Sequence, residues 1–197
     1  MHSTIRPPVT RRPLTALPPR LLSALAVLVL LAATSGLLAR SAGAATALFV
    51  VRLHNFPPGS ILFELTNVSG TLFFQSDDGT HGVELWKSDG TAAGTTLVKD
   101  INPGSASSNL YYLTNVSGKL FFKADDGSHG QELWKSDGTA IGTALVADIN
   151  SGSVGSGPSD LTNVNGTLFF QANDGTGGTQ LLKLASGTAV YLPLTVR

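Results

Sequence analysis

The chain has 197 residues, of which 42% are hydrophobic, only 13% are charged and 22 are Gly, a composition that favours a turn-rich β protein over a helical one. It contains no Cys, which excludes disulfides, thiolate metal sites and Cys nucleophiles. The formal net charge is zero, but residues 1–44 hold five Arg and no acid, so the rest of the chain carries 8 basic and 13 acidic residues. This acidic remainder has no basic stripe, which argues against nucleic acid as a partner.

The first 44 residues have the order of an export signal. Arg-rich residues 1–20 precede an uncharged, mostly apolar run from Leu21 to Ala39, and Ala42-Gly43-Ala44 then supplies an A-x-A-like cleavage site. We therefore expect a signal peptide over 1–44 that is removed, and a secreted, extracellular or cell-surface protein. An uncleaved membrane anchor is the alternative, because the 19-residue apolar run is nearly long enough to span a bilayer. The pair Arg11-Arg12 leaves twin-arginine export open beside the general secretory route.

We expect residues 45–64 to form a spare strand and the connection to the first repeat. Val50-Val51-Arg52-Leu53 followed by Pro58-Gly59-Ser60 echoes Leu97-Val98-Lys99-Asp100-Ile101 followed by Pro103-Gly104-Ser105. The segment therefore resembles the tail of a missing repeat.

A period of 48 residues organises the chain from residue 65 onward. Glu84-Leu85-Trp86-Lys87-Ser88-Asp89-Gly90-Thr91 returns letter for letter at Glu132 to Thr139, 48 residues later. The first repeat covers 65–112 and the second 113–160, and the two agree at 33 of 48 positions. The third, 161–197, is degenerate, and we interpret it as a cap because terminal repeats are commonly atypical.

Turn signals divide each repeat into four strands. In the second repeat these are expected at 113–116, 119–124, 131–136 and 143–149, and the third repeat has Asn165-Gly166, a strong hairpin signal, at the first turn. Leu120-Phe121-Phe122 places apolar groups on both faces of one strand, which fits sheets stacked against one another. Four short strands in about 40–50 residues is typical of a propeller blade. The predicted fold is all-β: tandem four-stranded repeats forming a partial β-propeller of about three blades.

The copies resemble the ELWxxDGT repeat, which is found in secreted and surface-associated bacterial proteins, often in long tandem arrays. In the second repeat the matching pieces are Gly118-x-Leu120-Phe121-Phe122, Asp126-Gly127, Glu132-Leu133-Trp134-x-x-Asp137-Gly138-Thr139, Gly142-Thr143 and Leu145-Val146-x-Asp148-Ile149. The resemblance covers about residues 49–197 and implies a propeller-building fold without enzymatic activity. The third repeat departs from it, with Gln180 for Glu, Leu182 for Trp and no Asp before Gly187.

Acidic residues recur at one turn of every repeat and are the candidate metal ligands. They are Asp77, Asp78, Asp125, Asp126 and Asp174. A calcium site usually needs six or more oxygen ligands, whereas Asp-Gly turns are explained by Asp bonding its own backbone and Gly supplying positive φ. His81 and His129 recur in the same turn, but the third repeat has Gly177 there. We therefore predict structural turns, with no metal and no cofactor.

Two residue types in the repeated motif are candidate ligand contacts. Trp86 and Trp134 would stack on sugar rings if exposed, and would pack between blades if buried. Glu84 and Glu132 would be either repeated ligand-binding acids or buried carboxylates bonded to the backbone of the adjacent blade, and we favour the second because buried charges need partners.

No Ser/His/Asp arrangement and no phosphate-binding loop is recognisable in the sequence. The sequence therefore predicts a non-catalytic, exported structural or binding module. A carbohydrate-binding, lectin-like propeller is the main alternative and a secreted hydrolase is a third. Expected partners are further copies of the chain, other surface proteins or glycans, and a membrane only through an uncleaved signal segment.

Overall fold

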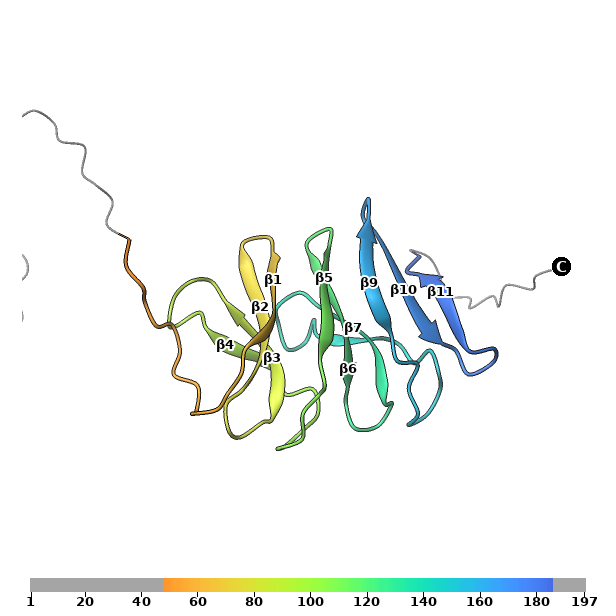
Figure 1. Cartoon of the computed structure of the whole chain (residues 1–197), viewed down its shortest axis with the longest axis horizontal. Coiled ribbons are helices and arrows are strands. Elements are labelled where there is room, and N and C mark those ends of the chain that lie inside the picture. Colours follow the sequence, from red (N-terminus) through yellow and green to blue (C-terminus); the bar gives the residue numbers. More distant parts are fainter. Residues whose placement is uncertain (1–47, 186–197) are drawn as a thin grey trace, which may run out of the picture. The chain divides into compact units, whose positions relative to one another are not determined.

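The computed structural model describes residues 48–185, which form three antiparallel β-sheets and contain no helix (Figure 1). The predicted signal peptide over 1–44 and the end of the third repeat, 186–197, lie outside the described residues. All eleven strands belong to one compact unit that begins at Val50. Within the described range, no helix could cross a membrane.

Each sheet is built from strands that follow one another in the chain (Figure 1). The first sheet contains β1 (Phe63–Val68), β2 (Thr71–Asp77), β3 (Val83–Ser88) and β4 (Thr96–Lys99). The second contains β5 (Tyr111–Val116), β6 (Lys119–Asp125), β7 (Gln131–Ser136) and β8 (Ala144–Ala147). The third contains β9 (Ser159–Val164), β10 (Thr167–Asn173) and β11 (Thr179–Lys183).

The predicted two-residue hairpin turns are confirmed. Ser117 and Gly118 join β5 to β6 with φ values of 52° and 80°, and Val116 pairs directly with Lys119. Positive φ at both central positions is the geometry whose twist matches that of the flanking strands. Asn165 and Gly166 have the same geometry, with φ of 51° and 85°, between β9 and β10.

The prediction of a spare strand in residues 45–64 is wrong for the part that is described, because residues 48–62 form no strand and β1 already begins at Phe63. Pro57 and Pro58 lack the N–H groups that a sheet needs. Instead, the rings of His54 and Phe56 lie 5.1 and 4.9 Å from the Trp86 ring, so this segment covers one side of the first sheet.

The fourth strand is shorter than expected, because β8 spans Ala144–Ala147 rather than 143–149. Beyond its end, the backbone N–H groups of Ile149 and Asn150 donate to the Glu132 carboxylate. The Glu132 side chain therefore takes the Ile149 N–H, which the prediction assigned to the sheet.

The core consists of two clusters separated by the second sheet. Phe122 belongs to a cluster with Phe73 and Leu85 of the first sheet, whereas its neighbour Phe121 belongs to a cluster with Leu168 of the third. Successive side chains of a strand point to opposite faces, so the second sheet is packed on both sides. The third sheet contributes Leu168, Phe170 and Ala172 of β10 to the second cluster from one face only.

Candidate functional site

Glu84 lies in the middle of β3 with no exposed surface. Its carboxylate accepts hydrogen bonds from the backbone N–H of Ile101 at 2.9 Å and of Asn102 at 3.3 Å. Burial raises the pKa of Glu84 to about 7, against the opposing effect of these bonds and one from Ser108. The Glu84 side chain therefore holds the backbone at Ile101 and Asn102, where the chain leaves the first sheet.

Glu132 occupies the same place in β7. Its carboxylate accepts from the N–H of Ile149 and of Asn150, both at 3.2 Å, and from the N–H and hydroxyl of Ser156 at 2.8 and 2.5 Å. The sequence-based interpretation placed the partners of these acids on the adjacent repeat. They lie instead in the connection that follows the same sheet, so neither carboxylate points to a ligand.

The two Trp side chains are interior residues, with 4% of Trp86 and 5% of Trp134 exposed. His54 and Phe56 cover Trp86, while Trp134 belongs to the cluster between the first and second sheets. The Lys99 ammonium lies 5.6 Å from the centroid of the Trp134 ring. Neither ring face is open to a sugar.

In the Asp-Gly turns, the Asp side chains accept hydrogen bonds from backbone N–H groups of the same turn. Asp78 accepts from the N–H of Thr80 at 2.8 Å and of His81 at 3.0 Å, and its second oxygen lies 2.8 Å from His81 Nδ1. The hydrogen bond to the Asp78 carboxylate raises the pKa of His81, and the Asp78 charge adds to this effect. Asp126 and His129 repeat the arrangement, again with 2.8 Å between carboxylate and Nδ1.

The remaining candidate metal ligands also bond their own turns. Asp77 and Asp125 accept from the N–H of Gly79 and Gly127 at 2.7 and 2.8 Å. Asp174 accepts from both the N–H and the hydroxyl of Thr176. Between residues 48 and 185, no group of three or more acidic or His side chains is placed to hold a metal ion.

Sequence reasoning missed a series of hydrogen bonds between the sheets. Thr66 Oγ1 donates to the Leu113 carbonyl at 3.1 Å, and Thr114 Oγ1 donates to the Leu161 carbonyl at the same distance. These residues belong to the block Leu-Thr-Asn-Val, which stands unchanged in all three repeats. That recurrence was the available signal, although it does not reveal which side chain crosses between sheets.

A second set of bonds between the sheets runs in the opposite direction, from an Asn side chain to an Asn carbonyl of the preceding sheet. Asn115 Nδ2 donates to the Asn67 carbonyl at 3.0 Å, and Asn163 Nδ2 donates to the Asn115 carbonyl at 2.9 Å. Both bonds join residues 48 positions apart.

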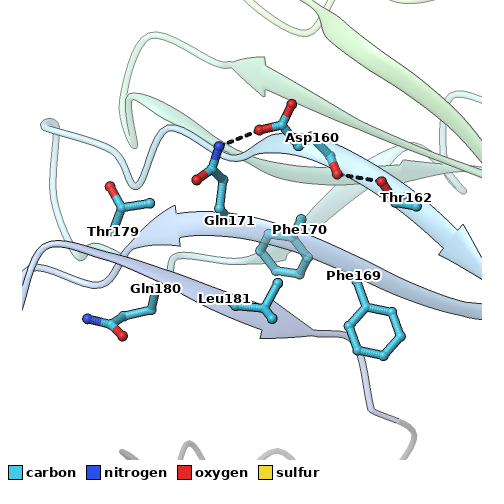
Figure 2. Close-up of a pocket in the computed structure, with 8 residues that line it drawn as sticks. All are labelled: Asp160, Thr162, Phe169, Phe170, Gln171, Thr179, Gln180 and Leu181. Atoms are coloured by element: carbon cyan, nitrogen blue, oxygen red, sulfur yellow. Dashed lines mark hydrogen bonds between the residues drawn. The ribbon is translucent and has the colours of Figure 1, made fainter.

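The third sheet carries a shallow cavity of about 370 Å³ (Figure 2). Its lining comes from β9, β10 and β11 and consists of Asp160, Thr162, Phe169, Phe170, Gln171, Thr179, Gln180 and Leu181. Figure 2 shows the Gln171 side chain donating to the Asp160 carboxylate, and Thr162 Oγ1 donating to the Asp160 carbonyl at 2.8 Å. The cavity combines apolar side chains with amides and one acid, and it has no nucleophile activated by a base.

Comparison with protein-family models, with curated proteins and with solved structures gives no match. Function is therefore inferred from the geometry of the described residues and from the repeated motif.

Proposed function

We propose that the protein is an exported, non-catalytic structural or binding module, built from propeller-type blades of an ELWxxDGT-like repeat. One observation carries the proposal: the bonds from Thr66 to Leu113 and from Thr114 to Leu161 join successive sheets through the same atoms at the same distance. Sheets that meet face to face through one repeated contact are the arrangement that a propeller uses.

The side chains that recur in the motif support a structural role. Glu84 and Glu132 hold connections, His81 and His129 pair with their turn Asp, and the two Trp side chains fill the interior. A catalytic site usually needs unlike residues with complementary roles, whereas each of these residues has the same structural role in the first and the second sheet. Sugar stacking on Trp86 or Trp134 is not proposed, because their rings are covered.

Export is inferred from the order of residues 1–44 and is tested by N-terminal sequencing. When the whole chain is produced in a bacterial host, the released protein should begin at or near Ala45. Recovery of the intact chain in the membrane fraction would mean that the N-terminal segment is an uncleaved membrane anchor. Retention of the protein in the cytoplasm would contradict export.

The non-catalytic part of the proposal has a separate test. The released protein is incubated with chromogenic glycosides, esters and peptides, and turnover should not exceed that of buffer. A matched Glu84→Gln, Glu132→Gln variant separates a genuine activity from a contaminant. Turnover that disappears in this variant while its circular dichroism spectrum stays that of the parent protein would make the repeated acids catalytic and overturn the proposal.

A further inference from the structure

The third sheet leaves uncovered a face that the other two sheets bury. Leu181 of β11 is 75% exposed, whereas its counterparts Leu133 and Leu85, which stand 48 and 96 residues earlier, are 1% and 0% exposed. Val164 is exposed in the same way, although Val116 and Val68 are buried. In the first and second sheets this face packs on the next sheet along the chain, and no described residue packs on it in the third.

The first sheet leaves only part of its opposite face uncovered, because His54 and Phe56 already lie against Trp86 on that face. Leu65 of β1 is 62% exposed, whereas Leu113 and Leu161, at the same place in β5 and β9, are each 8% exposed. The segment that carries His54 and Phe56 covers Trp86 and leaves Leu65 open. The chain therefore presents one half of its internal sheet-to-sheet contact on the third sheet, and the part of the other half around Leu65 on the first sheet.

Polar groups of that contact are also unused on the third sheet. Thr66, Thr114 and Thr162 each donate to the carbonyl two residues earlier. Thr66 and Thr114 also donate to the Leu carbonyl of the next sheet, whereas Thr162 meets no cross-sheet acceptor among the described residues. The Asn163 carbonyl stands where those of Asn67 and Asn115 accept an Asn side chain.

Charged groups extend the match. The Glu64 carboxylate accepts from the Leu113 N–H at 3.1 Å, and the third sheet has the carboxylate of Asp160 at the same position. Lys87 Nζ donates to the Gly138 carbonyl of the second sheet at 2.7 Å, and Lys183 repeats Lys87.

One close contact shows how the third sheet would accommodate a first sheet. A Cβ added at Gly138 would lie 3.1 Å from the ring of Phe73, so this Gly packs tightly on the preceding sheet. The equivalent Gly90 of the first sheet has open space, and the equivalent of Phe73 on the third sheet is Phe169. Both partners of this contact are therefore available on a second copy of the chain.

We infer that the third sheet of one copy binds the first sheet of a second copy, head to tail, through those sheet-to-sheet contacts of the chain that residues 54–56 leave open on the first sheet. Leu65 of one copy then covers Leu181 and Val164 of the other, and Thr162 and Asn163 receive the missing partners. The inference rests on the proposed function in taking the sheets as propeller-type blades. Two copies of the described region contain six sheets, within the roughly four to eight blades of closed propellers, so a pair closes by two identical contacts.

The oligomeric state tests the inference. The released protein is measured by size-exclusion chromatography with light scattering and by sedimentation over a range of concentrations, and the mass should be that of two copies. Leu181→Asp and Leu65→Asp should each raise the dissociation constant of the dimer about 30-fold or more, as expected for a buried interface anchor. Ile141→Asp is the matched control, because Ile141 is 97% exposed outside this contact, and it should leave the dimer unchanged.

A mixing experiment establishes the orientation. Leu65→Asp protein keeps an intact third sheet and Leu181→Asp protein keeps an intact first sheet, so the mixture should form pairs that neither variant forms alone. Successful pairing also proves that both variants are folded. No pairing in the mixture, or a Leu65→Asp variant that remains dimeric, would overturn the head-to-tail contact.

Two further outcomes are decisive. A wild-type protein that stays monomeric at high concentration, with or without residues 186–197, would overturn the inference. That result would leave export and the lack of turnover untouched, so it is distinguishable from failure of the proposed function. Conversely, a cytoplasmic or hydrolytic protein could still form the dimer.

Discussion

The Glu84 carboxylate accepts a 2.9 Å hydrogen bond from the backbone N–H of Ile101, 17 residues further along the chain. Ile101 is buried, so its N–H has no access to water and depends on this partner. The equivalent bond joins Glu132 to Ile149 at 3.2 Å. The acid of the repeated motif thus fixes the route from one sheet to the next.

Removing this acid should destabilise the fold. Glu84→Ala leaves the N–H groups of Ile101 and Asn102 without an acceptor, and each buried unsatisfied group costs about 1–3 kcal/mol. Urea unfolding monitored by circular dichroism should report a free energy of unfolding lower by at least that much. Gln180→Ala is the control, because Gln180 is exposed at the same place in the third sheet and should change stability by about 0.5 kcal/mol or less. Equal effects of the two changes would contradict the assigned role.

The same carboxyl group should make stability depend on pH. Burial raises the pKa of Glu84 to about 7, from a usual value of 4.5, so the folded protein keeps a proton that the unfolded chain has already lost. The stability from this group is therefore fully present below about pH 4.5 and is lost as the pH rises to about 7. Glu84→Gln cannot ionise, and the difference in unfolding free energy between the two proteins should change over this window and be constant outside it. A constant difference throughout would exclude a raised pKa.

His81 should titrate above the usual pH because of Asp78. The hydrogen bond that His81 makes to the Asp78 carboxylate, together with the Asp78 charge, raises the pKa of His81. In Asp78→Asn protein the ring loses a charged acceptor, so its pKa should fall, as followed by the imidazole proton shifts in NMR. His129 keeps Asp126 in the same molecule and provides an internal control that should not move. If the substitution left the pKa of His81 unchanged, the assigned interaction between His81 and Asp78 would be contradicted.

Local patterns predicted the strands and turns well. The third strand of the second repeat was expected at 131–136 and is observed as Gln131–Ser136, and the hairpin at Ser117-Gly118 has the expected positive φ values. Both features depend on residues that are neighbours in the chain: alternation along a strand, and the preferred residues of a two-residue turn.

Features set by distant residues were not predictable in the same way. Ile149 was expected in a strand, but its N–H is taken by Glu132, 17 residues earlier. Val50 and Val51 read as a spare strand by composition, yet the segment just after them places His54 and Phe56 on Trp86 instead of pairing with a sheet. Tertiary contacts overrode strand propensity at both places.

Calcium should have no effect on stability if the Asp-Gly turns are structural. The oxygens of Asp78 and Asp126 already accept N–H groups and pair with a His, which leaves few ligands for a cation that needs six or more. Thermal unfolding in millimolar Ca²⁺ and in excess chelator should then give transitions within about 1 °C, since only a bound ligand raises the midpoint by mass action. The Asp126→Asn variant checks any shift that is seen. A large rise in Ca²⁺ that this variant loses would establish a metal site.

Replacing Gly130 should destabilise the fold more than replacing Gly178, the equivalent Gly of the third sheet. The comparison separates the cost of positive φ from the cost of crowding around an added Cβ. The φ of Gly130 is 66°, and an added Cβ would lie 2.7 Å from the Ser153 carbonyl oxygen, closer than real Cβ atoms approach. Gly178, 48 residues later, has a φ of 83° and nothing within 4 Å of the same added atom.

Gly178→Ala should therefore cost only the strain of positive φ, about 1–2 kcal/mol. Gly130→Ala adds the displacement of the connection around Ser153, and overpacking of this kind costs a further 1–3 kcal/mol or so. Urea unfolding of the two variants beside the parent protein measures the difference directly. Equal losses would mean that the connection yields without cost, and the close approach at Gly130 would then contribute nothing to holding the chain between the second and third sheets.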